Sequence, residues 1–154
     1  RLQYYTFESQ KISQYKDTRN GLVGEGYSSK FSAWLAHGCL SPRKIYYEIK
    51  EYEAMHGANE STYWLVFELL WREYFRFVME KYGTRLFMPG GIKSTAKNFK
   101  KENTHLLQEW INETTGNDFV DANMLEIQHA GFLSNRGRQN LARYLCNELK
   151  LASR

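Results

Sequence analysis

The apolar residues of this chain recur at helical spacing, whereas the strict alternation of polar and apolar residues that predicts strands is scarce. In residues 28–38, Phe31, Trp34 and Leu35 stand at positions i, i+3 and i+4. Two serines suited to helix capping precede them, and Gly38 follows. This pattern predicts a short helix. Residues 1–15 give no clear pattern.

Two longer helices are predicted next. The first begins at Ser41, a capping residue, with Pro42 in the first helical position, and it ends at Gly57. Its inward stripe consists of Ile45, Ile49 and Tyr52. The second covers residues 61–82 and is unusually aromatic. Its rings belong to Tyr63, Trp64, Phe67, Trp71, Tyr74, Phe75 and Phe77.

The remainder of the chain predicts a loop followed by shorter helices. Residues 84–104 are rich in turn-forming and polar residues and predict a loop with at most short helical turns. Helices are predicted over residues 105–116 and 121–131, and a last helix opens near Ser134 or Asn135. This last helix carries Leu141, Leu145 and Leu149 at four-residue intervals.

A length of 154 residues is usual for one domain, so residues 1–154 are expected to form a single, nearly all-α domain. The net charge of +4 is compatible with an anionic partner but is too small to demand nucleic acid. No apolar segment is long enough to span a bilayer, and no signal peptide opens the chain. We therefore expect no membrane association. The protein is expected to be cytoplasmic in a bacterium, or organellar or nuclear in a eukaryote.

The cysteines and histidines do not predict a metal site. Cys39 and Cys146 lie far apart, each among apolar neighbours in a predicted helix, so both are expected to be buried free thiols. The four histidines lack the spacing of metal ligands. No metal is therefore expected.

One face of the predicted aromatic helix combines rings with charge. Trp64, Glu68, Trp71, Arg72 and Phe75 follow one another at steps of four, three, one and three. A carboxylate among rings needs a partner or a polar cavity, because an unpaired buried charge is costly. Two interpretations remain open: a core helix in which Glu68 binds Arg72 one turn on, or a functional site.

Two other segments allow both a functional and a structural interpretation. The segment GYSSKFS, residues 26–32, could bind a phosphate through backbone N–H groups at a helix start, or its serines could simply cap that helix. The segment FLSNRGRQN, residues 132–140, places polar and arginine residues between two apolar helices. It could form a site around Asn135, or a helix cap followed by solvated arginines.

Five segments, taken together and in order, resemble the flavin-binding helical domain of cryptochromes and photolyases. They are YKDTRNGL, GYSSKFSAWLAHGCLSPR, STYWLVFELLWREYFRF, TTGNDFVDANM and GFLSNRGRQNLARYL. The NRGRQN form, with glutamine, is similar to that of DASH-type cryptochromes. The resemblance covers nearly the whole chain and implies the N-terminal part of an all-α FAD-binding domain, which this chain is expected not to complete.

The resemblance implies FAD as the cofactor and identifies residues that would hold it. Residues matching the segment around the FAD diphosphate and ribityl group are Tyr15, Ser28, Ser29, Lys30, Phe31 and Ser32. Lys30 stands where many photolyases have Arg, which keeps the charge but loses the planar fork. Arg72 matches a residue beside the flavin, and Arg138 matches an arginine that pairs with a flavin-site carboxylate. Asn135 matches the residue that faces flavin N5.

The resemblance also implies the residues that act on DNA. Glu68 matches the acid that faces a pyrimidine lesion, and Trp71 matches the ring that stacks on the flipped dimer; with Asn135 they form the implied catalytic set. Residues matching DNA contacts are Arg19, Trp71, Arg136 and Gln139. The implied reaction is blue-light-driven electron transfer from reduced FAD to a cyclobutane pyrimidine dimer, preferentially in single-stranded DNA.

Other parts of the family's site are expected outside this chain. These include the antenna domain, for which a folate is expected only in the full-length protein, and the aspartates near flavin N1, so we expect weak FAD retention. Ala152 and Ser153 stand where the family usually has Asp and Trp. A monomer is expected. Two other functions remain open: a photoreceptor or regulatory flavoprotein without repair activity, and a flavin-free helical module that binds nucleic acid.

Overall fold

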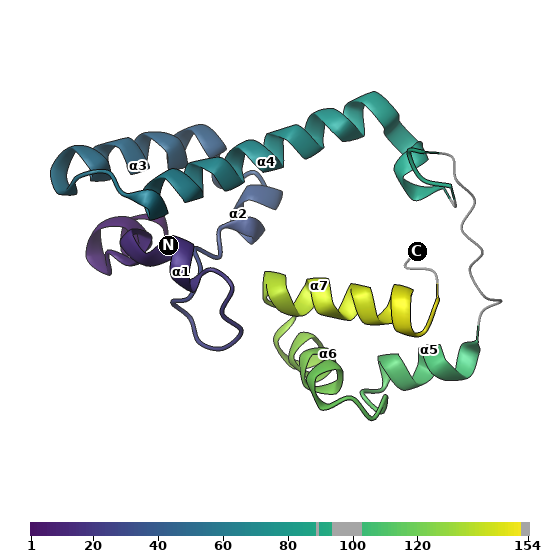
Figure 1. Ribbon diagram of the computed structural model, residues 1–154. Coiled ribbons are helices and arrows are strands. Elements are labelled where there is room, and N and C mark those ends of the chain that lie inside the picture. The colour runs from purple at the N-terminus through teal and green to yellow at the C-terminus, as the bar shows by residue number, and fades with distance from the viewer. Residues whose placement is uncertain (89, 94–102, 152–154) are drawn as a thin grey trace. The chain divides into compact units, whose positions relative to one another are not determined.

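A computed structural model describes residues 1–88, 90–93 and 103–151 of the chain (Figure 1). Over these residues the chain forms helices and turns without strands, which confirms the predicted all-α class. The chain divides into two compact units, Arg1–Lys81 and Tyr82–Arg154. Each unit is described separately below.

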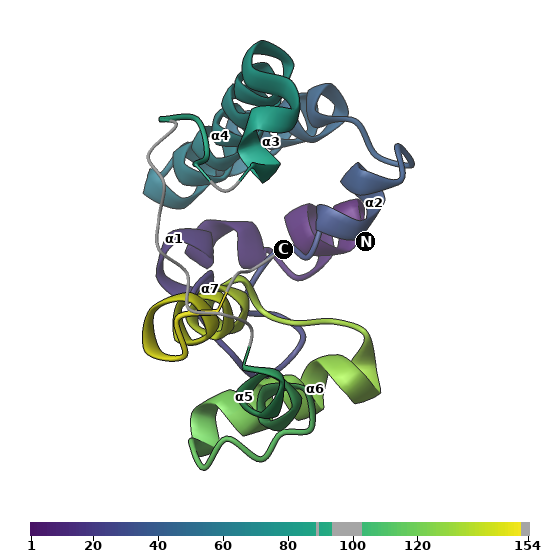
Figure 2. The same ribbon diagram turned by 90° about the vertical axis from the view of Figure 1, so that its right-hand side faces the viewer.

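The first unit is built from short N-terminal helices and two long ones. Its elements are a π-helix η1 (Tyr4–Glu8), a 3-10 helix η2 (Lys11–Gln14), and the α-helices α1 (Tyr15–Thr18), α2 (Ser32–Ala36), α3 (Pro42–His56) and α4 (Glu60–Tyr82). Figures 1 and 2 show α3 beside the N-terminal half of α4. Their common core contains Leu2, Tyr5, Ile12, Tyr15, Phe31, Ile45, Ile49, Tyr52 and Leu65.

Helix α3 forms as its sequence predicts. The hydroxyl of Ser41 accepts a hydrogen bond from the Lys44 N–H at 3.1 Å, and Pro42 occupies the first turn. The helix stops at Gly57, whose φ of 85° suits a residue without a Cβ. The predicted inward stripe is confirmed, because Ile45, Ile49 and Tyr52 are all buried.

The predicted helix over residues 28–38 is too long. Helix α2 contains only five residues, and its N-cap, Phe31, makes no side-chain cap hydrogen bond. The interpretation of Ser28 and Ser29 as caps is therefore wrong. Lys30 explains the late start, because its φ of 55° lies in the left-handed region, which breaks the helix before residue 31.

A buried carboxylate connects the N-terminal helices to α3. The Glu48 residue is only 7% exposed. Its carboxylate accepts a hydrogen bond from the Gln3 amide and another from the Thr6 hydroxyl, the latter at 3.4 Å. Because these donors lie in and beside η1, they fix that helix against α3 and satisfy a group that would otherwise be costly to bury.

The second unit contains shorter helices. They are the 3-10 helix η3 (Gly83–Phe87), the α-helices α5 (Thr104–Ile111), α6 (Asp118–Ala130) and α7 (Asn135–Arg143), and the π-helix η4 (Tyr144–Glu148). The loop with short helical turns predicted over residues 84–104 is confirmed in part, because η3 is one such short turn. Residues 94–102 of that loop lie outside the described residues, as do Ala152 and Ser153.

The starts of α5 and α6 differ from the prediction because asparagine caps set them. Asn103 caps α5 by accepting from the Leu106 N–H, and Asn117 caps α6 by accepting from the Val120 N–H. Helix α6 thus begins three residues earlier than predicted, at Asp118. The last helix, predicted as a single element, consists of the α-helix α7 followed directly by the π-helix η4.

The predicted burial of both thiols is wrong. Cys39 is exposed in a bend after α2, and Cys146 is half-buried in η4. The apolar neighbours of Cys39 in the sequence misled the prediction, because α2 ends at Ala36 and Cys39 lies in the bend that follows.

Helix α7 packs closely on α6 at Gly137. A Cβ on Gly137 would lie 2.2 Å from Asn123 Oδ1 and 3.0 Å from both Leu133 Cδ1 and Ser134 Oγ. The Asn123 side chain is held by a hydrogen bond to the Phe119 carbonyl at 2.7 Å, and Ser134 caps α7. Neither side chain can yield without losing a hydrogen bond, so this crossing requires glycine.

We expect Gly137→Ala to lower the free energy of unfolding by about 1–3 kcal/mol, because overpacking outweighs the helix preference for Ala. Urea unfolding followed by far-UV circular dichroism measures this change. The matched control is Ala142→Gly at an exposed position of α7, which should cost about 0.5–1 kcal/mol from helix propensity alone. Stabilisation by Gly137→Ala would contradict the close packing.

Candidate functional site

The segment before α2 is held by Arg1. The Arg1 guanidinium donates hydrogen bonds to three carbonyl oxygens: Ser29 at 3.1 Å, Ser28 at 3.2 Å and Glu25 at 3.0 Å. This cation also lies over the rings of Tyr4 and Tyr5. Because the carbonyls are bound on one side, the segment has a fixed orientation. Sequence reasoning missed Arg1, since no local motif pairs it with a loop about 25 residues further on.

The hydroxyls of this segment fit a phosphate-bearing ligand. Ser28 and Ser29 are half-buried and Ser32 is exposed. Among the described residues, none forms a hydrogen bond with any of these three hydroxyls. A set of unpartnered hydroxyl donors on a fixed loop is suited to the diphosphate of a nucleotide cofactor such as FAD. The helix dipole adds little here, because α2 has only five residues.

Lys30 and Phe31 stabilise the segment from within. The Lys30 ammonium donates to the Gly24 carbonyl at 3.0 Å and lies 4.8 Å from the centre of the Tyr27 ring. Phe31 is buried and makes an edge contact with the Tyr5 ring. Lys30 thus supplies positive charge near the serines while its ammonium is directed to its own loop.

Glu68 binds Arg19 and not Arg72. The Glu68 carboxylate forms an ion pair with the Arg19 guanidinium from the end of α1. Arg72 instead pairs with Glu73 at 2.5 Å, and Glu73 also lies 3.5 Å from Arg76. The interpretation of a Glu68–Arg72 pair is therefore wrong, because a cation from another helix has taken the carboxylate.

Tyr15 and Trp64 complete the surroundings of this ion pair. The Tyr15 side chain is buried and hydrogen-bonded to Arg19. Burial, followed by the nearby Glu68 charge, raises the pKa of Tyr15 to about 12. The Trp64 ring lies 5.3 Å from the Arg19 guanidinium and 5.5 Å from the Lys16 ammonium. We call Tyr15, Arg19, Trp64 and Glu68 the Arg19 cluster.

Beyond Glu68, α4 presents rings at the surface. Trp71 is 41% exposed, and its ring contacts those of Phe67, Tyr74 and Phe75 with centroids 5.3–6.0 Å apart. A surface hollow of about 380 Å³ is lined by Phe67, Leu70, Trp71 and Tyr74. Such rings offer flat faces on which a base can stack.

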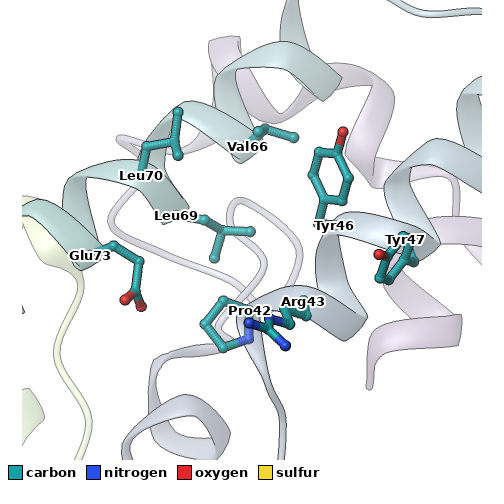
Figure 3. A pocket seen from close by; sticks show the side chains of 8 residues that line it. All are labelled: Pro42, Arg43, Tyr46, Tyr47, Val66, Leu69, Leu70 and Glu73. Carbon is teal, nitrogen blue, oxygen red and sulfur yellow. The ribbon is translucent and has the colours of Figure 1, made fainter.

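A second hollow lies between α3 and α4 (Figure 3). It measures about 280 Å³ and is mainly apolar. Its lining residues are Pro42, Arg43, Tyr46 and Tyr47 from α3, and Val66, Leu69, Leu70 and Glu73 from α4. None of the predicted site residues lines it.

The remaining predicted site residues lie at the start of α7 in the second unit. Ser134 caps the helix by accepting from the Gly137 N–H at 2.9 Å. The side chains of four predicted site residues are exposed on the first two turns: Asn135, Arg136, Arg138 and Gln139. Arg136 donates to the Gln139 side chain at 3.3 Å. The cap interpretation of this segment is confirmed.

Predicted site residues lie in both units. In the first unit the structure brings Tyr15, Arg19 and Glu68 into one cluster, and it fixes the serine segment separately through Arg1. In the second unit it gathers the α7 residues on one helix. In the described part of the chain, no group of three or more potential metal ligands occurs, and no helix is both long and apolar enough to cross a membrane.

Comparison with known proteins identifies the class. Residues 64–154, more than half of the chain, match the family described as the FAD binding domain of DNA photolyase. The chain therefore belongs to this family, whose match begins within α4 and continues through α7.

Within this class, the chain is a homologue of cryptochrome DASH proteins. It is 54% identical to cryptochrome DASH of Synechocystis over 97% of its own length and 30% of that protein, and 52% identical to cryptochrome DASH of Xenopus laevis over 97% and 28%. The crystal structure of Synechocystis cryptochrome superposes with a TM-score of 0.92 at 53% identity, covering 97% of this chain and 31% of that one. The chain thus spans about three tenths of the length of these relatives.

The raised pKa of Tyr15 predicts alkaline destabilisation. The unfolded chain releases the phenolic proton near the ordinary pKa of 10.0, whereas the folded chain holds it to about 12. The stabilising preference for the neutral phenol is therefore complete below pH 10 and is lost as the pH rises to 12. We expect a loss of about 2–3 kcal/mol from this group.

Unfolding by urea at pH values from 9 to 12 measures this loss. Tyr15→Phe removes the titrating group, so its stability should fall less steeply over the same interval. Glu68→Gln should lower the pKa of Tyr15 by removing a nearby negative charge. An unchanged pH dependence in Tyr15→Phe would contradict the assignment.

Proposed function

We propose that this chain is the flavin- and DNA-binding part of a blue-light-dependent enzyme that repairs cyclobutane pyrimidine dimers, preferentially in single-stranded DNA. The observation that carries the proposal is the arrangement on α4, where the exposed Trp71 ring follows the paired carboxylate of Glu68 by three residues. One face of a single helix thereby offers a stacking surface and a hydrogen-bond acceptor to a base.

The cofactor of this enzyme would be FAD. Residues that would hold its diphosphate and ribityl group are Tyr15, Ser28, Ser29, Lys30, Phe31 and Ser32, and Arg72, Asn135 and Arg138 are the residues proposed to act on its flavin part. The unpartnered serine hydroxyls and the Arg1-bound loop support this assignment. When bound and reduced, FAD supplies the electron that light transfers to the dimer and that returns after the cyclobutane ring splits.

The chain's own residues would position the lesion. Trp71 stacks on the flipped dimer, and Glu68 accepts hydrogen bonds from its polar edge. Arg19, Arg136 and Gln139 contact the DNA backbone, which supplies affinity independent of sequence. Single-stranded DNA is preferred because extruding a base from a duplex costs a few kcal/mol, and stacking on one tryptophan returns only about 1–3 kcal/mol.

Repair by the natural protein that contains this chain tests the proposal. A single-stranded oligonucleotide with one thymine dimer, illuminated with blue light in the presence of reductant, should lose the dimer. Trp71→Ala should weaken binding of this oligonucleotide by about 1–3 kcal/mol, or roughly 5- to 150-fold. Trp71→Phe should recover part of the affinity because it retains a ring.

The matched control is Phe77→Ala, which removes an exposed ring of α4 outside the hollow. This variant should bind and repair like the wild type. Flavin binding without any repair would contradict the proposal in favour of a photoreceptor, whereas nucleic-acid binding without flavin would favour a helical binding module.

FAD binding has its own prediction. The double variant Ser28→Ala/Ser29→Ala should bind FAD at least about tenfold more weakly, because each lost hydrogen bond to a charged phosphate is worth about 1.5–3 kcal/mol. Flavin fluorescence on titration of the apoprotein measures the affinity. Ser9→Ala is the control, since Ser9 donates to the Tyr4 carbonyl outside this segment. Equal affinities for the double variant and the control would remove the serines from the FAD site.

A further inference from the structure

Arg19 has two roles that exclude one another. As a DNA contact it should turn its guanidinium to a phosphate, yet in the DNA-free chain that guanidinium is bound to the Glu68 carboxylate. The proposed function needs Glu68 as well, as the acceptor that faces the lesion. The Arg19 guanidinium therefore cannot pair fully with the Glu68 carboxylate and with a DNA phosphate at the same time.

We propose that Arg19 is a positioning residue that exchanges Glu68 for a DNA phosphate, so that binding of the DNA backbone releases Glu68 for the lesion. This inference rests on the proposed function and deepens it. In the free protein the ion pair keeps Glu68 occupied. In the complex the phosphate takes Arg19, and the Glu68 oxygens become available to the flipped base. Backbone binding and lesion binding are thereby coupled.

The geometry allows the exchange at low cost. The side chains of Arg19 and Glu68 are 25% and 34% exposed, so water and a phosphate can reach both. Ion pairs this open to solvent contribute only about 0–1 kcal/mol. A phosphate can bind the Arg19 guanidinium through two parallel hydrogen bonds, as a carboxylate does. Replacing Glu68 by a phosphate therefore costs little free energy.

The surroundings hold the backbone while the guanidinium moves. The Lys16 N–H donates to the Ser61 hydroxyl at 3.0 Å, which attaches α1 to the start of α4. The Asn59 amide donates to the Ser13 carbonyl at 3.3 Å, which attaches the preceding η2 to the residue before α4. The Trp64 ring supports the Arg19 cation from one side at 5.3 Å. Only the outer end of the Arg19 side chain needs to turn.

A double-mutant cycle on DNA affinity tests the exchange. The probe is an undamaged single-stranded oligothymidylate, and binding to the natural protein is followed in the dark by fluorescence anisotropy at several salt concentrations. Glu68→Gln frees Arg19 and should tighten binding roughly two- to fivefold. Arg19→Gln should weaken binding and reduce the salt slope by about 0.7, the value for one phosphate on a single strand.

The decisive result is the double variant. In the Arg19→Gln background, Glu68→Gln should have no more effect than Glu80→Gln, which removes an exposed carboxylate of α4 and reports the general effect of charge, less than about twofold. Arg19→Lys keeps the charge without the fork and should bind DNA between the wild type and Arg19→Gln. Melting curves identify any variant whose fold is damaged, and Arg19→Met, which also removes the cation but keeps an unbranched apolar side chain, then replaces Arg19→Gln in the cycle.

Three results would overturn the inference. Glu68→Gln could tighten binding no more than Glu80→Gln, or it could tighten binding equally without Arg19; either leaves the proposed function intact and removes only the exchange. A wild-type protein that fails to bind the oligonucleotide would defeat the proposed function and the exchange together.

Discussion

The attachment of α1 to α4 is the contact on which the candidate site depends. Tyr15 is buried in the core of the first unit, and from the same turn Arg19 reaches the Glu68 carboxylate. The Glu68 side chain is 34% exposed, so water can also solvate its charge and the pair contributes little to stability. The main effect of the pair is to determine where the carboxylate points. Core packing and site geometry therefore share the same few residues.

Local signals predicted most of the fold. Helix α3 follows from a serine cap, a proline in the first turn and three apolar residues at helical spacing, and each was found as expected. The short α2 was overestimated because Lys30 adopts a left-handed φ, a conformation that sequence propensity assigns to Gly or Asn. The predicted start of α6 was wrong because one side chain, the Asn117 cap, determines which of several neighbouring residues begins the helix.

The sequence proposed candidate site residues but could not predict their contacts. Spacing along α4 placed Glu68 and Trp71 on one face and offered Arg72, four residues on, as one possible partner of the carboxylate. The actual partner, Arg19, is 49 residues away in sequence. The contact between Arg1 and the serine loop was also not predictable. The Arg1 guanidinium donates to backbone carbonyls, which every residue has, so the loop needs no particular residue type as the acceptor.

Helix α4 changes character along its length, and Glu68 stands at the transition. Its N-terminal part is buried at Ser61, Thr62 and Leu65, whereas the rings of Trp71, Tyr74, Phe75 and Phe77 are exposed. Burying apolar surface stabilises a fold by about 25 cal/mol per Å², and exposed rings do not contribute this free energy. A group of exposed rings is therefore characteristic of a binding surface. A carboxylate at this boundary is close enough to the core to be oriented by Arg19 and open enough to meet a ligand. Its position thus combines a rigid support with access, which is the requirement for a side chain that must hold a base in place.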